Sequence, residues 1–179
     1  PKAGECIFDV SALSKVALER CTTAREAIEL MGALAVEYGY YGWGETLTVA
    51  DTEEAWVFEI CATPDQKSAL WAAVKVTDGE VFVESNIFRI RELDPNYPDT
   101  MFSPNLIEVA TAAGWYDPSS GPIDWMATVS TGEYSQPYYS LRRIWRVLDR
   151  AAPSLELSPW VEDGFTKDYP FSVVPDKKL

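Results

Sequence analysis

One asparagine lies where the pattern of a β-strand breaks. The run VFVESNIFRIREL at 81–93 opens with β-forming residues after the turn signal Asp78-Gly79, and the apolar pattern resumes at Ile87. Asparagine is depleted in strands and is costly to bury without partners. Asn86 therefore either pairs with backbone at a bulge, or donates its N–H groups to a developing negative charge as an oxyanion donor does.

Half of the arginines of the chain fall within LRRIWRVLDR at 141–150, namely Arg142, Arg143, Arg146 and Arg150. Guanidinium groups bind carboxylates in a bidentate manner, so this cluster is a candidate site for a substrate carboxylate. The alternative is that these arginines only pair with surface acids, which are abundant in a chain of net charge −13.

Two other groups of residues offer candidate chemistry. The carboxylates of Asp51, Glu53, Glu54 and Glu59 are close enough in sequence for acid–base work, although the middle two fall at an expected turn. The run YGYYGWGE at 38–45 offers aromatic faces for stacking on a sugar, and ordinary loop packing is the alternative.

Composition excludes several classes of function. The net charge of −13 argues against nucleic acid and anionic membranes as partners, because both require clustered basic residues. The absence of histidine removes Ser-His-Asp and Cys-His catalysis and most zinc sites from this chain, so we expect no metal and no cofactor. Cys6, Cys21 and Cys61 show no CxxC spacing and indicate reduced thiols, so we expect a cytoplasmic protein, with export as the alternative.

The elements that must position these residues point to an α+β fold in a single domain, 1–179. The capping-box spacing at Thr23-Ala-Arg-Glu26 predicts a helix that ends near Gly39. Strand patterns at 46–51 and 55–60 predict one hairpin.

A second hairpin is predicted from strands at 70–76 and 80–85, giving an antiparallel meander of four strands. The stretch rich in Pro and Asp at 94–104 is predicted to be a loop, followed by a helix over 105–113. A turn-rich connection leads to a helix over 139–150, and the pattern predicts no element for residues 1–20.

Several of these runs, in this order, resemble the bacterial dipeptidase A family, which is related to the secernins. The runs are EAWVFE, LWAAVKVTDGEVFVESNIFRIRELD, SPNL, GWYDPSSG, LRRIWRV and YPFSVVPDKKL, and the resemblance extends from about Thr23 to Leu179. Members of that family are cysteine hydrolases of the N-terminal nucleophile (Ntn) superfamily. The resemblance implies an αββα sandwich, a processed N-terminal cysteine as nucleophile, and hydrolysis of dipeptides.

The resemblance also implies a partial site. Asn86 occupies the place of a strand-end asparagine that helps hold the oxyanion or substrate, and Arg143 matches an arginine at a helix start near the nucleophile. Arg142 is the alternative to Arg143, and Ser103 and Asn105 are candidates for lining the substrate pocket.

The expected nucleophile lies upstream of the matched region, and neither Cys6 nor Cys21 fits that role. We therefore expect a middle segment of a longer dipeptidase that is inactive alone. Half of a sandwich exposes an apolar sheet face, so the expected partners are the rest of the enzyme or a second copy, besides the dipeptide substrate. The alternatives are a non-catalytic binding domain with the same sheet, or a glycan-binding module.

Overall fold

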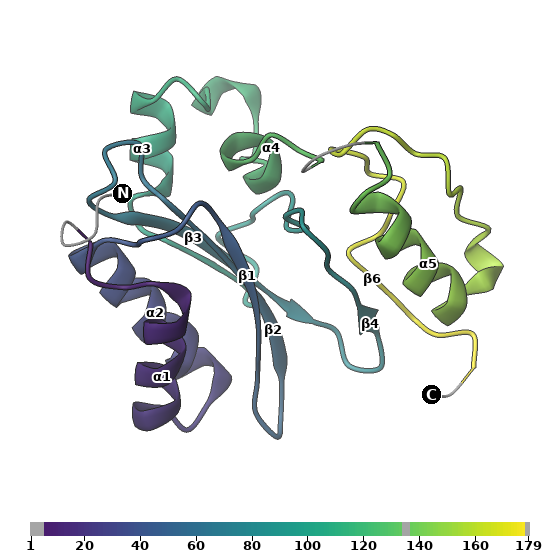
Figure 1. The fold of residues 1–179 in the computed structure, drawn as a ribbon, viewed down its shortest axis with the longest axis horizontal. Coiled ribbons are helices and arrows are strands. Elements are labelled where there is room, and N and C mark those ends of the chain that lie inside the picture. Colours follow the sequence, from purple (N-terminus) through teal and green to yellow (C-terminus); the bar gives the residue numbers. More distant parts are fainter. Residues whose placement is uncertain (1–5, 134–136, 178–179) are drawn as a thin grey trace. The chain divides into compact units, whose positions relative to one another are not determined.

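The computed structural model describes residues 6–133 and 137–177, and their contacts form two compact units. The first unit holds the described residues up to Lys75 together with Glu92–Ile123. The second holds Val76–Arg91 together with the described residues from Asp124 onward. Each unit thus combines an earlier and a later part of the chain (Figure 1). The single-domain assignment stays a prediction.

A four-stranded sheet with the order β1-β2-β3-β5 is the centre of the first unit. Strands β1 (Glu45–Ala50) and β2 (Ala55–Ala62) form the antiparallel hairpin that the sequence predicts. Strand β3 (Ala69–Val76) pairs antiparallel with β5 (Thr100–Phe102). Helices and antiparallel strands together confirm the α+β class, whereas the αββα sandwich stays a prediction.

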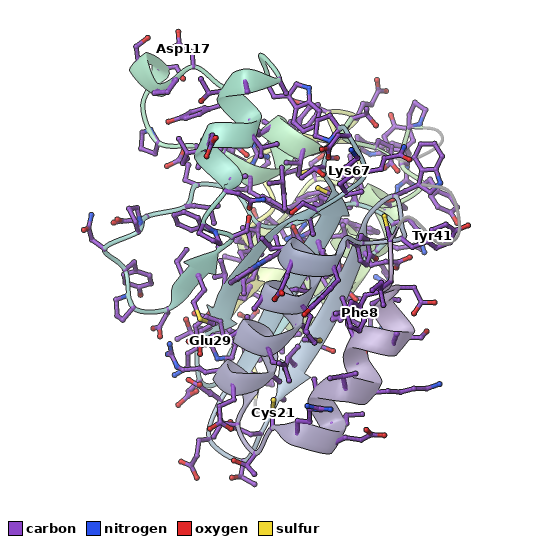
Figure 2. All side chains as sticks on the ribbon, turned by 90° about the vertical axis from the view of Figure 1, so that its left-hand side faces the viewer. Phe8, Cys21, Glu29, Tyr41, Lys67 and Asp117 are labelled. Carbon is purple, nitrogen blue, oxygen red and sulfur yellow. The ribbon has the colours of Figure 1, made fainter. Side chains whose placement is uncertain are left out.

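Helices α1 (Val10–Arg20) and α2 (Ala24–Tyr38) lie side by side over one face of this sheet (Figure 2). The predicted capping box begins α2: the Thr23 hydroxyl accepts from the Glu26 N–H at 3.2 Å, and the Glu26 carboxylate accepts from the Thr23 N–H at 3.2 Å. The helix ends at Gly39, as predicted, whereas α1 lies where the pattern predicts no element.

The core of the first unit lies between these helices and the strands. Alternate residues of a strand point to the same face, so Trp56, Phe58 and Ile60 of β2 all reach the helices. Their buried partners on the helices and on β3 include Leu13, Ile28, Met31, Ala35 and Trp71. Val57, Glu59 and Cys61, on the other face of β2, are also buried. The expected exposed apolar face is therefore not found on this strand, and self-association stays a prediction.

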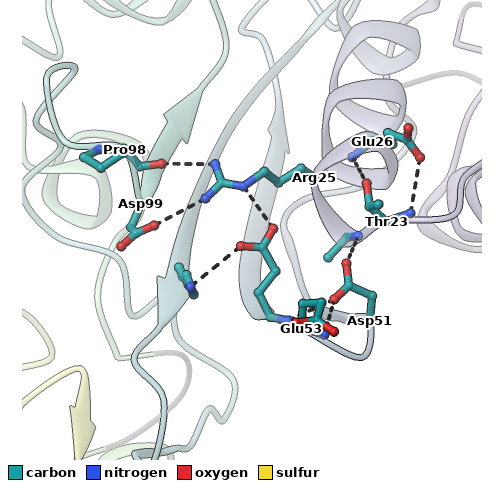
Figure 3. Close-up of polar contacts among 10 residues, drawn as sticks. Thr23, Arg25, Glu26, Asp51, Glu53, Pro98 and Asp99 are labelled. Atoms are coloured by element: carbon teal, nitrogen blue, oxygen red, sulfur yellow. Dashed lines mark hydrogen bonds and ion pairs between the residues drawn. The ribbon is translucent and has the colours of Figure 1, made fainter.

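A polar network joins the start of α2 to the β1–β2 turn and to the start of β5 (Figure 3). Asp51 accepts hydrogen bonds from the N–H groups of Ala24, Glu53 and Glu54 at 2.7–2.9 Å, which hold the pKa of this carboxyl below its usual value. Arg25 donates to the Pro98 carbonyl oxygen at 3.1 Å.

Arg25 also forms ion pairs with Glu54 at 2.9 Å and Asp99 at 3.3 Å, and its guanidinium lies 4.5 Å from the Trp56 ring. One arginine thus connects a helix, a turn and a strand within the first unit, because its planar group offers five donors.

The second unit has little regular structure besides one long helix. Helix α5 (Leu141–Ala151) packs Leu141, Ile144 and Leu148 into a core with Met126 of α4 (Trp125–Val129) and with Tyr169. Strand β4 (Val81–Phe82) pairs antiparallel with β6 (Ser172–Val173). The predicted helix over 139–150 is confirmed with its apolar face. In the first unit, α3 (Leu106–Ala112) confirms the helix predicted over 105–113.

The second predicted hairpin is wrong. A turn is present, because the Glu80 N–H donates to the Thr77 carbonyl oxygen at 3.0 Å, but β4 then pairs with β6 and not with β3. Strand β5 takes the place beside β3, within the stretch that its Pro and Asp content predicts to be a loop. Tertiary pairing outweighs local propensity in both places.

Gly32 of α2 allows the ring of Trp71 to lie directly against the helix. A Cβ atom at this position would be 2.3 Å from Cε2 of Trp71, whose side chain is buried beside Phe58 with ring centroids 5.6 Å apart. The indole is enclosed and has no space to withdraw, so the glycine is required by packing and not by its backbone angles.

We expect Gly32→Ala to lower the free energy of unfolding, although alanine favours a helix by about 1 kcal/mol over glycine. Overpacking costs about 1–3 kcal/mol, which offsets or exceeds that gain. Urea denaturation followed by tryptophan fluorescence measures the change, and Glu29→Ala, at an exposed position of α2, is the matched control and should shift little. A Gly32→Ala variant that is more stable than the wild type would contradict the packing assignment.

Candidate active site

Asn86 and Arg143 contact each other in the second unit. Asn86 is exposed at a bend after β4, and its Oδ1 accepts a hydrogen bond of 2.7 Å from Nη2 of Arg143, in the first turn of α5. The two residues are 57 positions apart in the chain. The structure therefore brings together the two residues that the resemblance implies to be catalytic, and their roles stay predictions.

Tyr139 holds the side chain of Arg143 from the turn just before α5. The Nε of Arg143 donates to the Tyr139 carbonyl oxygen at 2.9 Å, and its guanidinium carbon lies 4.3 Å from the centre of the Tyr139 ring. This ring contact is a cation–π interaction. Among the described residues, Nη1 of Arg143 has no hydrogen-bond partner, so it remains available to a ligand.

The contact with Arg143 also orients the Asn86 amide. A guanidinium only donates hydrogen bonds, so the atom that faces it must be the amide oxygen. The Nδ2 group of Asn86 then points away with both of its hydrogens. Together with Nη1 of Arg143, it forms a set composed of donors only, which suits a carboxylate or an oxyanion.

Arg142 has a different environment from its neighbour. Its guanidinium contacts two rings, 4.7 Å from the centre of Tyr138 and 4.5 Å from that of Trp160, and these rings meet edge-to-face with their centroids 6.0 Å apart. The Tyr138 hydroxyl donates to Glu162 at 2.5 Å, and this hydrogen bond raises the pKa of Tyr138. Arg142 thus packs against an edge-to-face pair of aromatic rings, and its substrate-binding role stays a prediction.

The first turn of α5 is fixed by a carboxylate from outside the helix. Glu133 accepts hydrogen bonds from the N–H groups of Ser140 at 3.0 Å and Leu141 at 3.1 Å. The Ser140 side chain makes no capping bond. A negative group at this end is favourable, since two arginines follow at a helix N-terminus where positive charge is disfavoured.

Ser103 and Asn105 lie in the first unit, where both make structural contacts. Ser103 is fully buried, and its hydroxyl accepts from the Trp71 N–H at 3.3 Å while its own N–H donates to the Trp71 carbonyl oxygen at 2.9 Å. The Asn105 amide donates to the carbonyl oxygen of Ala69 at 3.2 Å. These contacts tie β3 to the start of α3, and pocket lining by either residue stays a prediction.

The three thiols of the chain are poorly placed for nucleophilic attack. Burial, followed by the nearby Glu59, raises the pKa of Cys61 to about 12. Burial and then Glu26 raise the pKa of Cys21. Cys6 is buried, and its Sγ donates to the Gln66 carbonyl oxygen at 2.6 Å. Attack requires a thiolate, and the raised pKa values of Cys21 and Cys61 favour their neutral thiols.

The other candidate groups separate in the structure. Asp51 and Glu54 belong to the polar network around Arg25, whereas Glu59 is buried in β2. The carboxylates therefore do not gather in one acid–base site. In the glycine–aromatic run, Trp43 is 98% exposed whereas Tyr40 is fully buried. Within the described residues, no group of three or more His, Cys, Asp or Glu side chains is arranged to hold a metal ion.

Two pockets have defined linings. One of about 250 Å³ in the second unit is lined by Ile87 and Leu141, the chain neighbours of Asn86 and Arg142, and by Arg89, Arg91 and Tyr169 among others. The other, of about 280 Å³ in the first unit, lies between α1, α2 and β1 and is mostly apolar. No helix of the described residues is both long and apolar enough to cross a bilayer.

The model of peptidase family C69 matches residues 1–179, so the chain belongs to this family. The chain is 29% identical over 169 residues to a probable dipeptidase of Salmonella dublin, and 24% identical over 168 residues to a probable dipeptidase of Latilactobacillus sakei. Each alignment covers 94% of this chain, but 37% and 33% of the two relatives. The chain thus spans about a third of the length of these relatives.

Sequence reasoning missed the tyrosines and the acids that support the arginines. Tyr138 lies four residues before Arg142, and Tyr139 lies four residues before Arg143, but both tyrosines lie in the turn before α5 and Tyr138 has a positive φ of 74°. The doublets in YYSLRR show the four-residue spacing, but the ring contacts depend on the conformation of this turn. Glu133 and Glu162 carried no signal in the sequence, because their contacts depend on tertiary structure.

We expect Cys61 to resist alkylation in the folded chain. A thiol with a pKa of about 12 has a thiolate fraction at pH 7 roughly 10³-fold below that of a free cysteine, and burial restricts access further. Iodoacetamide labelling at pH 7, read by peptide mass spectrometry, tests this, with the urea-unfolded chain as control. Labelling of folded Cys61 at the rate of the unfolded control would overturn the assignment.

Proposed function

We propose that this chain is the part of a cysteine-type dipeptidase that binds the negatively charged groups of the substrate and of the transition state. The observation that carries the proposal is the 2.7 Å hydrogen bond between Asn86 and Arg143, which leaves only donor groups directed outward. Membership of peptidase family C69 and similarity to two probable dipeptidases support the substrate class.

In this proposal a thiolate attacks the carbonyl carbon of the peptide bond, and the carbonyl oxygen becomes an oxyanion. Nδ2 of Asn86 donates to that oxygen, where a hydrogen bond strengthens as the charge develops. The guanidinium of Arg143 orients Asn86 and offers Nη1 to the second anionic group, the substrate carboxylate. The amine leaves with a proton, and water then hydrolyses the thioester.

The nucleophile of this proposal is a cysteine from outside this chain. Support comes from the buried or raised-pKa thiols of Cys6, Cys21 and Cys61, and from relatives about three times as long. An N-terminal cysteine needs no histidine, because its own amino group has a pKa near 8 and serves as base. Reduced thiols of this kind suit the cytoplasm. An αββα sandwich completed by the remaining polypeptide is the fold that we propose around it.

A second candidate function is a non-catalytic binding domain with the same sheet, which is favoured by the lack of a suitable thiol in this chain. Mass-spectrometric sequencing of the mature natural product discriminates the two functions. A processed cysteine at a new N-terminus supports the dipeptidase, and a mature product without one supports the binding domain.

We expect Asn86→Ala in the complete encoded polypeptide to lower kcat by about 10²-fold or more, as the loss of an oxyanion donor does. Hydrolysis of Ala-Ala, followed by release of free amines, measures the effect. Asn96→Ala is the matched control, because Asn96 is exposed in a turn of the first unit and should retain wild-type turnover. Wild-type kcat in Asn86→Ala would return this residue to a structural role.

The 179-residue chain alone should show no dipeptide hydrolysis, whereas the complete polypeptide should be active and should lose that activity on treatment with iodoacetamide. The reason is that the attacking thiolate is proposed to lie outside the chain. The same amine-release assay applies to both samples. Turnover by the isolated chain, or activity of the complete polypeptide that survives full alkylation, would contradict the proposal.

A further inference from the structure

The outward face of α5 is a ridge of positive charge, made by Arg143, Arg146 and Arg150. These residues are exposed and follow the spacing of three and four positions that places side chains on one face of a helix. Leu141, Ile144 and Leu148 form the opposite, buried face. With a rise of 1.5 Å per residue, the ridge extends about 10 Å along the helix, starting at the arginine that binds Asn86.

This ridge contrasts with the rest of the chain. The whole chain has a net charge of −13, yet Asp149 is the one acidic residue within α5. Asp149 forms an ion pair with Arg146 at 3.1 Å, so it neutralises part of the ridge. Arg150 forms no ion pair or hydrogen bond through its side chain with another described residue. The ridge therefore keeps a net positive charge next to the proposed site.

We propose that the ridge makes dipeptides with an acidic side chain the favoured substrates of this site, an inference that rests on the proposed function. An ordinary dipeptide is a zwitterion with no net charge, so a field attracts it weakly. An acidic dipeptide carries a net charge of −1, which the ridge attracts and the remainder of an acidic protein repels.

The spacing on the helix supports binding as well as attraction. Side chains three positions apart on a helix are close neighbours, about 5–6 Å apart at Cβ. A dipeptide with a second carboxylate therefore meets Arg146 while its first anionic group is bound at Arg143 and Asn86. Val147, which is 42% exposed one helical turn after Arg143, adds an apolar surface for the methylene groups of such a side chain.

The test compares Ala-Glu with Ala-Gln, two dipeptides that differ in charge but hardly in shape. We expect kcat/KM of the complete polypeptide to be higher for Ala-Glu than for Ala-Gln. The ratio of these two kcat/KM values should fall as NaCl is raised to about 0.5 M, because salt screens exposed charges. Arg146→Gln and Arg150→Gln should together lower the ratio by about three- to fivefold, as expected for two screened charges at this distance.

Arg20→Gln is the matched control, because Arg20 is an exposed arginine at the end of α1, and it should leave the ratio unchanged. Equilibrium binding of both dipeptides to the 179-residue chain, followed by NMR of the arginine Nε–H groups, tests the ridge without catalysis. Equal affinity for both dipeptides, or a ratio that the ridge variants leave unchanged, overturns the inference. Failure of the proposed function looks different, because the complete polypeptide then hydrolyses neither dipeptide.

Discussion

The second unit depends on arginine side chains that donate hydrogen bonds to backbone carbonyl oxygens of its loops. A guanidinium carries five N–H donors in a plane and no acceptor, so a partly buried one can bind oxygens from several segments, as Arg89 and Arg91 do. Arg89 donates to the Pro170 carbonyl oxygen at 2.6 Å, and Arg91 donates to the Phe165 carbonyl oxygen at 2.5 Å while pairing with Asp124 at 2.7 Å. These bonds hold in place the loop residues Phe165 and Pro170, which are not part of a β-strand.

The candidate site also depends on an arginine that donates hydrogen bonds, but here one donor group has no partner among the described residues. Arg143 donates one hydrogen bond from Nε to the Tyr139 carbonyl oxygen and one from Nη2 to Asn86. Because Arg143 lies at the surface, its Nη1 has no hydrogen-bond partner among the described residues. Arg142, one position earlier, is enclosed by Tyr138 and Trp160. Neighbouring residues of one helix point about 100° apart, so two identical side chains enter different surroundings: Arg142 contacts Tyr138 and Trp160, and Arg143 lies at the surface beside Asn86.

Much of the first unit could be predicted from local signals. The capping box at Thr23 and Glu26 and the alternation in β2 specify their elements directly, because each depends on neighbours within a few residues. Helix α5 was equally readable from its apolar spacing. The pairing of β4 with β6, and the entry of β5 into the sheet, were not readable, because partners distant in sequence decide strand pairing.

By itself, the sequence determined the residue types available for chemistry: no histidine, three cysteines without a metal pattern, and four arginines on one helix. It also determined that Arg143 lies opposite the apolar face of that helix, since the helical repeat settles this locally. Only the tertiary structure decided that Asn86 meets Arg143, that burial keeps Cys61 protonated, and that Ser103 is enclosed beside Trp71. Each of these facts depends on which segments, distant in sequence, pack against one another. This packing determines how far each side chain is exposed to solvent and which hydrogen-bond partners it reaches.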